Sequence, residues 1–152
     1  MSGCLLQVPT ESGAAWAALP EEYLVEMSGA IKDFLMFCPD WTRSDAMPEA
    51  SHVANSWVPK AELIDITSTW TAGVRSTAAQ VTVPVHSRQG EFDQLWITDA
   101  QQVADFGAAF TAAPLVDAKL FLGAGHCIDF HRGGRAFQLE QLAFALTCCV
   151  RP

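Results

Sequence analysis

The sequence predicts a mixed α/β fold in which a small parallel sheet of about three strands is flanked by crossover helices. In residues 81–152, short apolar runs of strand length alternate with amphipathic stretches of helical period, in the order strand, helix, strand, helix. This order is typical of parallel strands joined by crossover connections. Residues 11–80 have a mostly helical pattern, and 152 residues suffice for one domain with a hydrophobic core. We therefore interpret residues 1–152 as a single domain: a strand in 1–10, a helical region in 11–80 and an α/β core in 81–152.

The first predicted strand is the apolar run Cys4–Val8, which Pro9 ends. The first predicted helix covers 21–37, because its apolar residues recur at spacings of three and four until Cys38-Pro39 interrupts the pattern. These apolar residues are Leu24, Met27, Ile31, Phe34 and Leu35.

Residues 40–58 show no sustained period and read as an exposed connection. Pro59 then opens a second predicted helix over 60–79, since proline is well tolerated in a first helical turn, where its missing N–H is not needed. The two predicted helices and their connection make up most of the helical region.

The α/β core is predicted to begin with a strand at Val81–Val85. Thr98 or Asp99 can cap the next helix, which continues to Phe110 and has its apolar side chains on one face. The buried run 118–122 follows as the next strand.

The last predicted helix covers 135–149. Its apolar residues are Phe137, Leu139, Leu142, Phe144 and Leu146. We expect this helix to pack against the sheet as the final layer of the core.

Composition narrows the possible partners. Half of the residues are hydrophobic, 17% are charged, and the net charge is −8 with an isoelectric point near 4.7. No basic stripe is present to neutralise phosphates, so we expect neither nucleic acid nor a membrane surface as a partner. A small-molecule substrate or a protein partner is the expectation, and the apolar composition suggests surface that a partner would cover.

Cysteine usage and the absence of targeting signals point to the cytoplasm. Five cysteines, an odd number without metal-type spacing, favour a reducing compartment. The first residues lack a basic segment of the kind that begins a signal peptide, and no apolar run approaches the roughly 18 residues needed to cross a bilayer. We expect a soluble, cytoplasmic protein without a cofactor or a metal.

Two loops carry the residues suited to chemistry. The motif Gly-Glu-Phe-Asp at 90–93 follows the strand at 81–85, and Gly-Ala-Gly-His at 123–126 follows the strand at 118–122. In open α/β sheets, ligands bind beyond the carboxyl ends of the strands. Asp93 is therefore expected near the site.

This order of strand, acid loop, helix, strand and histidine loop resembles the C-terminal half of an α/β-hydrolase, in which the catalytic triad runs nucleophile, acid, histidine along the chain. The resemblance implies that Asp93 is the acid and His126 the base, with the acid holding the imidazole in the required tautomer. It also implies that the helical region 11–80 is a cap-like insertion over the sheet. The resemblance is closest in residues 80–150.

Three further residues are candidates for binding the substrate. Trp96 lies close in sequence to Asp93, and Phe92 belongs to the same loop. Cys127 adjoins His126; we considered it as a replacement nucleophile, but neighbouring residues diverge at a turn, so we expect it to be buried.

The family's nucleophile is missing from the sequence. The elbow motif Gly-x-Ser-x-Gly does not occur. Ser28 lacks the preceding glycine and sits in a helical pattern, and Ser76 has the wrong spacing. We expect either a piece of a longer hydrolase, a chain that meets a complementary one, or a remodelled protein.

Each candidate residue also has a simpler interpretation. Asp93 could cap a turn or pair with Arg88, and Glu91 could be the acid instead. The trio His126, Asp129 and His131 could bind a metal, although the resemblance places the latter two as structural loop residues.

The predicted function is hydrolysis or acyl transfer on a small apolar ester-type substrate, with Asp93 and His126 as the acid and histidine of the reaction. One alternative is a non-catalytic, self-associating, truncated hydrolase-like binding protein. Another is an enzyme that uses the Asp-His pair for proton transfer alone, such as an isomerase or a cyclase. In each case, we expect a homo-oligomer or a complementary chain to complete the sheet.

Overall fold

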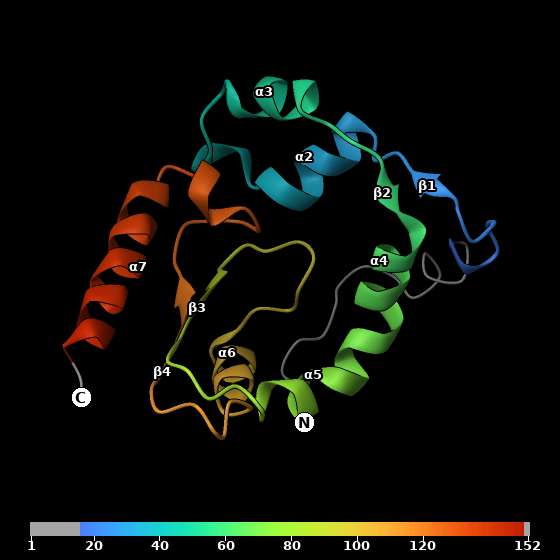
Figure 1. The fold of residues 1–152 in the computed structure, drawn as a ribbon. Coiled ribbons are helices and arrows are strands. Elements are labelled where there is room, and N and C mark those ends of the chain that lie inside the picture. Colours follow the sequence, from blue (N-terminus) through green and yellow to red (C-terminus); the bar gives the residue numbers. More distant parts are fainter. Residues whose placement is uncertain (1–15, 151–152) are drawn as a thin grey trace.

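A computed structural model describes residues 16–150 of the chain (Figure 1). The fold is mixed α/β, and its centre is a two-stranded parallel sheet of β3 (Val85–Gly90) and β4 (Val116–Phe121). The register runs from Val85 opposite Val116 to Gly90 opposite Phe121. Helix α6 (Ala100–Gly107) makes the crossover between the two strands. The predicted parallel sheet with a crossover helix is thus confirmed, with two strands in the described residues; the expected strand Cys4–Val8 lies outside them.

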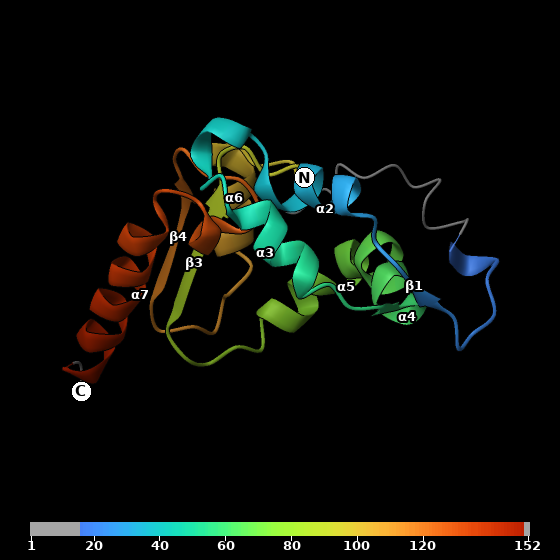
Figure 2. The same ribbon diagram turned by 90° about the horizontal axis from the view of Figure 1, so that it is seen from above.

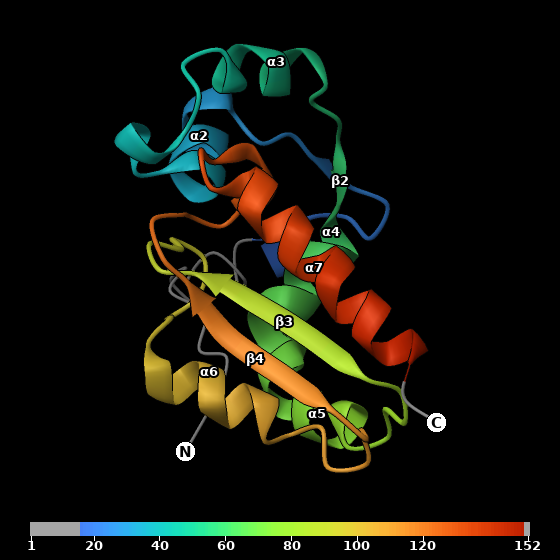
Figure 3. The ribbon, with the colours of Figure 1, turned by 90° about the vertical axis from the view of Figure 1, so that its left-hand side faces the viewer.

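Helices α6 and α7 (Gly134–Cys149) cover opposite faces of this sheet (Figures 1 and 3). Side chains alternate along β4, so Ala118 meets Gly107 of α6, whereas Phe121 packs edge-on against Phe137 of α7. Phe121, Phe137, Ala124 and Ile128 form the buried apolar cluster beneath α7. The helix predicted at 135–149 is confirmed.

Helix α6 begins where the sequence predicted. The Asp99 carboxylate accepts a hydrogen bond from the Gln102 backbone N–H at 2.7 Å and so caps the helix. This cap fixes the point at which the chain leaves the loop after β3.

The strand predicted at Val81–Val85 is displaced and instead occupies Val85–Gly90. The Val81 N–H bonds back to Ala78 at the end of the preceding helix, and Pro84 has no N–H to donate to a ladder. The first ladder bond is therefore made by Val85, whose N–H donates to the Leu115 carbonyl at 2.8 Å.

The observed β3 is polar, with the sequence Val-His-Ser-Arg-Gln-Gly, so no apolar run marks it as a strand. Arg88 in its middle is stabilised by two carboxylates: Nη2 donates to Asp117 at 2.9 Å and Nε donates to Glu140 of α7 at 2.7 Å. The hydrogen bonds that the Asp117 carboxylate accepts from Arg88 and from Lys119 lower its pKa to about 2. The alternative in which Arg88 pairs with Asp93 is therefore wrong.

The helical region departs from its predicted bounds at the first helix. Helix α2 spans Gly29–Phe37, and the Ser28 hydroxyl accepts from the Ile31 N–H, so Ser28 caps the helix rather than lying inside it. Residues before this cap form β1 (Leu24–Val25), which pairs antiparallel with β2 (Val58–Pro59). The expected start of this helix at residue 21 was wrong because serine favours the cap over the helix interior.

The connection at 40–58 contains a 3-10 turn, Asp40–Thr42, and a short helix, α3 (Met47–Val53). The helix predicted at 60–79 is present as α4 (Lys60–Ile64), a π-helical turn and α5 (Trp70–Ala78) in direct succession. Seen from above, α4 and α5 lie on the side of the sheet away from α7 (Figure 2). Across residues 16–150, no helix has both the length and the apolar character needed to cross a bilayer.

Helix α2 and the turn after it lie beyond the carboxyl ends of β3 and β4 (Figure 3). Two backbone hydrogen bonds join them to the chain after β4: Cys127 N–H donates to Met36, and Arg132 N–H donates to Thr42. Residues 36–43 thus form the roof under which the two chemistry-bearing loops meet.

Candidate functional site

Two loops follow the parallel strands: the acid loop, residues 90–98, and the histidine loop, residues 122–132. Backbone hydrogen bonds continue the pairing of the strands into these loops, from Glu91 N–H to Phe121 at 3.0 Å and from Phe92 N–H to Ala124 at 2.9 Å. Because the carboxyl ends of parallel strands share one edge, the two loops emerge side by side.

Close approach of three backbone segments requires glycine at two positions. A Cβ on Gly90 would collide with the Gly125 carbonyl, and a Cβ on Gly125 would collide with the Cys38 carbonyl. The glycines therefore let the end of β3, the histidine loop and the roof segment stack within contact distance.

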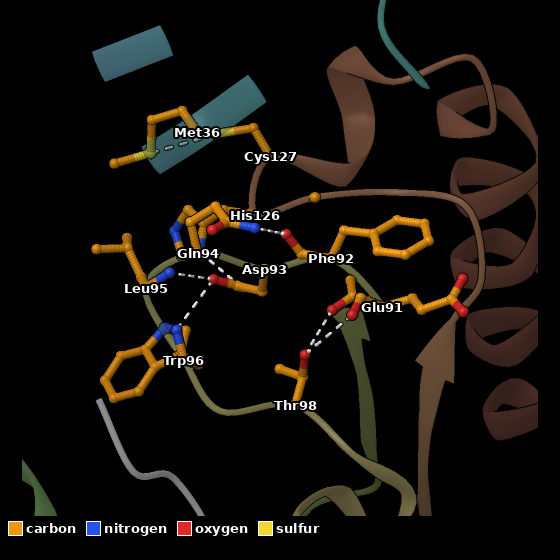
Figure 4. Close-up of polar contacts among 12 residues, drawn as sticks. Met36, Glu91, Phe92, Asp93, Gln94, Leu95, Trp96, Thr98, His126 and Cys127 are labelled. Atoms are coloured by element: carbon orange, nitrogen blue, oxygen red, sulfur yellow. Dashed lines mark hydrogen bonds and ion pairs between the residues drawn. The ribbon is translucent and has the colours of Figure 1, made fainter. Parts of the chain in front are cut away.

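Asp93 is buried, with 5% of its surface exposed, and its carboxylate is fixed at both oxygens (Figure 4). Oδ1 accepts the backbone N–H groups of Leu95 at 2.8 Å and Trp96 at 3.1 Å. Oδ2 lies 2.8 Å from Nδ1 of His126. The fold therefore brings together the two residues that the sequence predicted as acid and base, although they are 33 positions apart.

The hydrogen bond to Asp93 determines which nitrogen of His126 carries the proton. An ionised carboxylate only accepts, so Nδ1 carries a proton, and in the neutral imidazole Nε2 then keeps its lone pair. The His126 side chain is 29% exposed, and Nε2 makes no hydrogen bond to another residue in the 16–150 range. Nε2 is thus available to accept a proton from a bound molecule.

Glu91, the alternative acid, has a different role. Its carboxylate accepts the N–H of Gly123 at 2.9 Å, and Gly123 has a positive φ of 74° at the turn that leaves β4. Glu91 therefore braces the start of the histidine loop, while Asp93 is the carboxylate that reaches the imidazole.

The aromatic candidates pack against the helical region. The Phe92 ring points away from the Asp93 carboxylate and meets Trp41 edge-on, with ring centroids 5.3 Å apart (Figure 4). The Trp96 ring lies 6.3 Å from the Trp70 ring of α5. Both residues thus link the acid loop to the helical region, and their role in substrate binding remains a prediction.

Cys127 faces the roof. Its thiol lies 3.7 Å from the Met36 sulfur, and burial, reinforced by the negative charge of Asp93, raises the pKa of the thiol (Figure 4). A raised pKa reduces the thiolate fraction, which is the nucleophilic form. This environment suits a packed thiol rather than an attacking one.

The three residues considered as a metal cluster have separate partners. His126 bonds to Asp93, Asp129 accepts from Gln138 at 3.1 Å, and His131 bonds to Thr42. Within the described part of the chain, no group of three His, Cys, Asp or Glu side chains is arranged to hold a metal ion.

Sequence reasoning missed the roof as part of the site. Thr42 and His131 are both buried, at 2% and 5% exposure, and their side chains bond across 89 positions of sequence. No local motif marks such a long-range contact, and the weak period of residues 40–58 concealed it.

Comparison with protein families, with curated proteins and with solved structures finds no match to this chain. The functional argument therefore depends on the geometry of the acid and histidine loops and on the chemistry of the side chains that they present.

Proposed function

We propose that this chain supplies the acid and the histidine of an α/β-hydrolase-like catalytic unit that cleaves or transfers the acyl group of a small apolar ester-type molecule. The observation that carries the proposal is the buried Asp93 carboxylate, held by two backbone N–H groups and bonded to Nδ1 of the partly exposed His126. The pair lies beyond the carboxyl ends of two parallel strands, the usual place for ligands in such sheets.

In this role Asp93 keeps the proton on Nδ1 and stabilises the imidazolium that forms during reaction. Nε2 of His126 removes the proton from a hydroxyl as its oxygen attacks the ester carbonyl, and then returns that proton to the departing alkoxide. The proton therefore leaves the nucleophile and ends on the alcohol product, and the histidine is restored.

Among residues 16–150, no side-chain hydroxyl makes a hydrogen bond to His126. Thr98, the hydroxyl residue of the acid loop, donates to the Gly90 carbonyl at 3.0 Å (Figure 4), and Ser76 donates to Gly73 within α5. We infer that the nucleophile comes from outside residues 16–150, either from another part of the polypeptide or from a complementary chain.

Two surfaces support a complementary partner, either a second copy or another chain. The outer edge of β3 pairs with no strand among residues 16–150, and a two-stranded parallel sheet is small for independent stability. Helix α7 exposes Leu139, Leu142 and Leu146 at 66, 56 and 60%. A partner that added strands beside β3 and covered these leucines would bury both surfaces.

A fluorophosphonate probe, which labels a serine activated by a histidine, tests the proposal on the protein purified from its native source. The expected result is labelling at a serine outside residues 16–150, slowed at least about 100-fold by His126→Gln. His52→Gln is the matched control, because His52 forms a 2.8 Å pair with Asp33 on the surface, far from the two loops in sequence. Labelling that His126→Gln leaves unchanged would overturn the proposal.

A proton-transfer enzyme is the second candidate function, favoured by one observation. The Asp93-His126 pair is complete as a general base, and the adjacent Cys127 thiol is turned towards Met36. Proton abstraction needs no covalent intermediate. A protein that resists the probe but exchanges a substrate C–H proton with deuterated water in a His126-dependent manner would support this candidate over the first.

A further inference from the structure

A second histidine of the histidine loop, His131, lies in a buried chain of hydrogen bonds. The Thr42 hydroxyl donates to the Pro39 carbonyl at 2.6 Å, and Oγ1 also lies 2.6 Å from Nδ1 of His131. On the other side of the ring, the Gly125 backbone N–H donates to Nε2 at 3.2 Å. The ring therefore connects the roof to the residue that precedes His126.

Only one proton arrangement satisfies all these contacts. The single hydroxyl proton of Thr42 goes to Pro39, so Oγ1 must accept from Nδ1–H of His131. Nε2 must then be the unprotonated acceptor of the Gly125 N–H. His131 is thus a neutral, directional link, and burial lowers its pKa, which favours the same neutral form.

His126 is held from both neighbours. The preceding residue, Gly125, bonds to His131, and the following residue, Cys127, donates its N–H to the Met36 carbonyl at 3.1 Å. Of the two acceptors, the Met36 carbonyl belongs to the roof, residues 36–43, and the His131 ring is hydrogen-bonded to Thr42 of the roof. The backbone on either side of the imidazole is therefore fixed by groups that do not touch the reacting atoms.

We propose that His131 is a positioning residue, whose Nε2 holds the Gly125 backbone so that Nδ1 of His126 stays within hydrogen-bonding distance of Asp93. This inference rests on the proposed base role of His126 and adds a requirement to it. Catalytic groups must be held to within about 0.5 Å, so loss of the Gly125 anchor weakens the pair even though His131 contacts no substrate.

Two isosteric substitutions separate this role from simple structural support. In His131→Gln the amide oxygen reaches the place of Nε2 and still accepts from Gly125, but the contact with Thr42 is lost. In His131→Asn the amide nitrogen occupies the place of Nδ1 and still donates to Thr42, but nothing accepts from Gly125. Each variant removes one of the two buried hydrogen bonds, so urea unfolding should show similar losses of stability.

The readout is the Nδ1 proton resonance of His126 in protein with ¹⁵N-labelled histidine, assigned by its loss in Asp93→Asn. We expect His131→Gln to keep this resonance and His131→Asn to lose it through faster exchange with water. His86→Gln is the control, since His86 is packed against Phe137 and Phe144 on the far part of β3 and should leave the signal intact. Retention of the resonance in His131→Asn, or its equal loss in both His131 variants, would overturn the proposal.

A measurement on the unaltered protein covers the case in which a variant does not fold. A scalar coupling across the hydrogen bond between the Gly125 amide nitrogen and Nε2 of His131 is expected. Its absence would contradict the proposal that His131 anchors the Gly125 backbone. These spectra do not depend on turnover. If probe labelling proves independent of His126 while the two His131 variants still differ, the proposed function fails and the positioning role stands.

Discussion

Replacement of Asp93 by asparagine and by alanine separates the two tasks of its carboxylate. Asparagine keeps an oxygen that can accept the Leu95 and Trp96 N–H groups, and loses the charge-assisted bond to His126. Alanine leaves both N–H groups without this acceptor, at about 1 kcal/mol each or more in a partly buried loop. Asp93→Ala should therefore be about 2 kcal/mol less stable than Asp93→Asn.

The assay is urea unfolding of both variants with fluorescence detection. Asp99, which caps α6 through a single N–H from Gln102, provides the control: asparagine there should be nearly neutral and alanine should cost about 1 kcal/mol. The Asp93→Asn amide also presents N–H to Nδ1, which forces His126 into the wrong tautomer and should slow probe labelling on the order of 10⁴-fold. Equal unfolding free energies for the two Asp93 variants would refute this account of the acid loop.

Three further predictions concern the surroundings of the pair. Gly125→Ala should destabilise the protein by about 1 to 3 kcal/mol, because the new Cβ meets a backbone carbonyl. Gly73→Ala, in an open helical position, should instead stabilise the protein by about 0.5 to 1 kcal/mol. Thermal unfolding that ranks the two variants in the opposite order would contradict the packing of the roof. Burial lowers the pKa of His131 in the folded state, so the unfolded chain takes up the proton first as the pH falls. The urea midpoint should therefore decrease below about pH 6.5, and less steeply in His131→Gln. A midpoint that does not change between pH 8 and pH 5 would exclude a buried neutral histidine. Burial raises the pKa of the Cys127 thiol, so iodoacetamide should alkylate Cys127 more slowly than the exposed Cys149. Peptide mass mapping measures the two alkylation rates. Faster alkylation of Cys127 would indicate an activated thiol.

The meeting of the acid and histidine loops was predictable, although the strand before the acid loop was misplaced, because β4 and the start of α6 have local signals. The run 118–122 is apolar enough to be recognised as a strand, and β4 was found at Val116–Phe121. The Asp99 cap and the helix after it follow from short-range chemistry. Once two parallel strands are assigned, the loops after them must share an edge, which brings Asp93 near His126.

The parts that the sequence did not reveal depend on contacts between distant residues. Strand β3 contains Arg88, and an arginine becomes acceptable in a strand interior only because Asp117 and Glu140 come to meet it. The roof depends on Thr42 and His131, whose side chains pair across 89 positions. Periodicity cannot detect such partners.

The start of the first helix shows a different limit. Apolar residues at helical spacing continue through residues 24–27, but the chain prefers to cap at Ser28 and to place Leu24 and Val25 against β2. Spacing alone does not decide between a helix and a short strand when a capping serine lies inside the pattern.

The most direct test of the central claim is the tautomer of His126 in the unaltered protein, read from its side-chain ¹⁵N shifts at pH 8. The account predicts a proton on Nδ1, protected from exchange by Asp93, and an unprotonated Nε2. A proton on Nε2, or rapid averaging between the two nitrogens, would contradict the assignment of this pair as a preorganised general base.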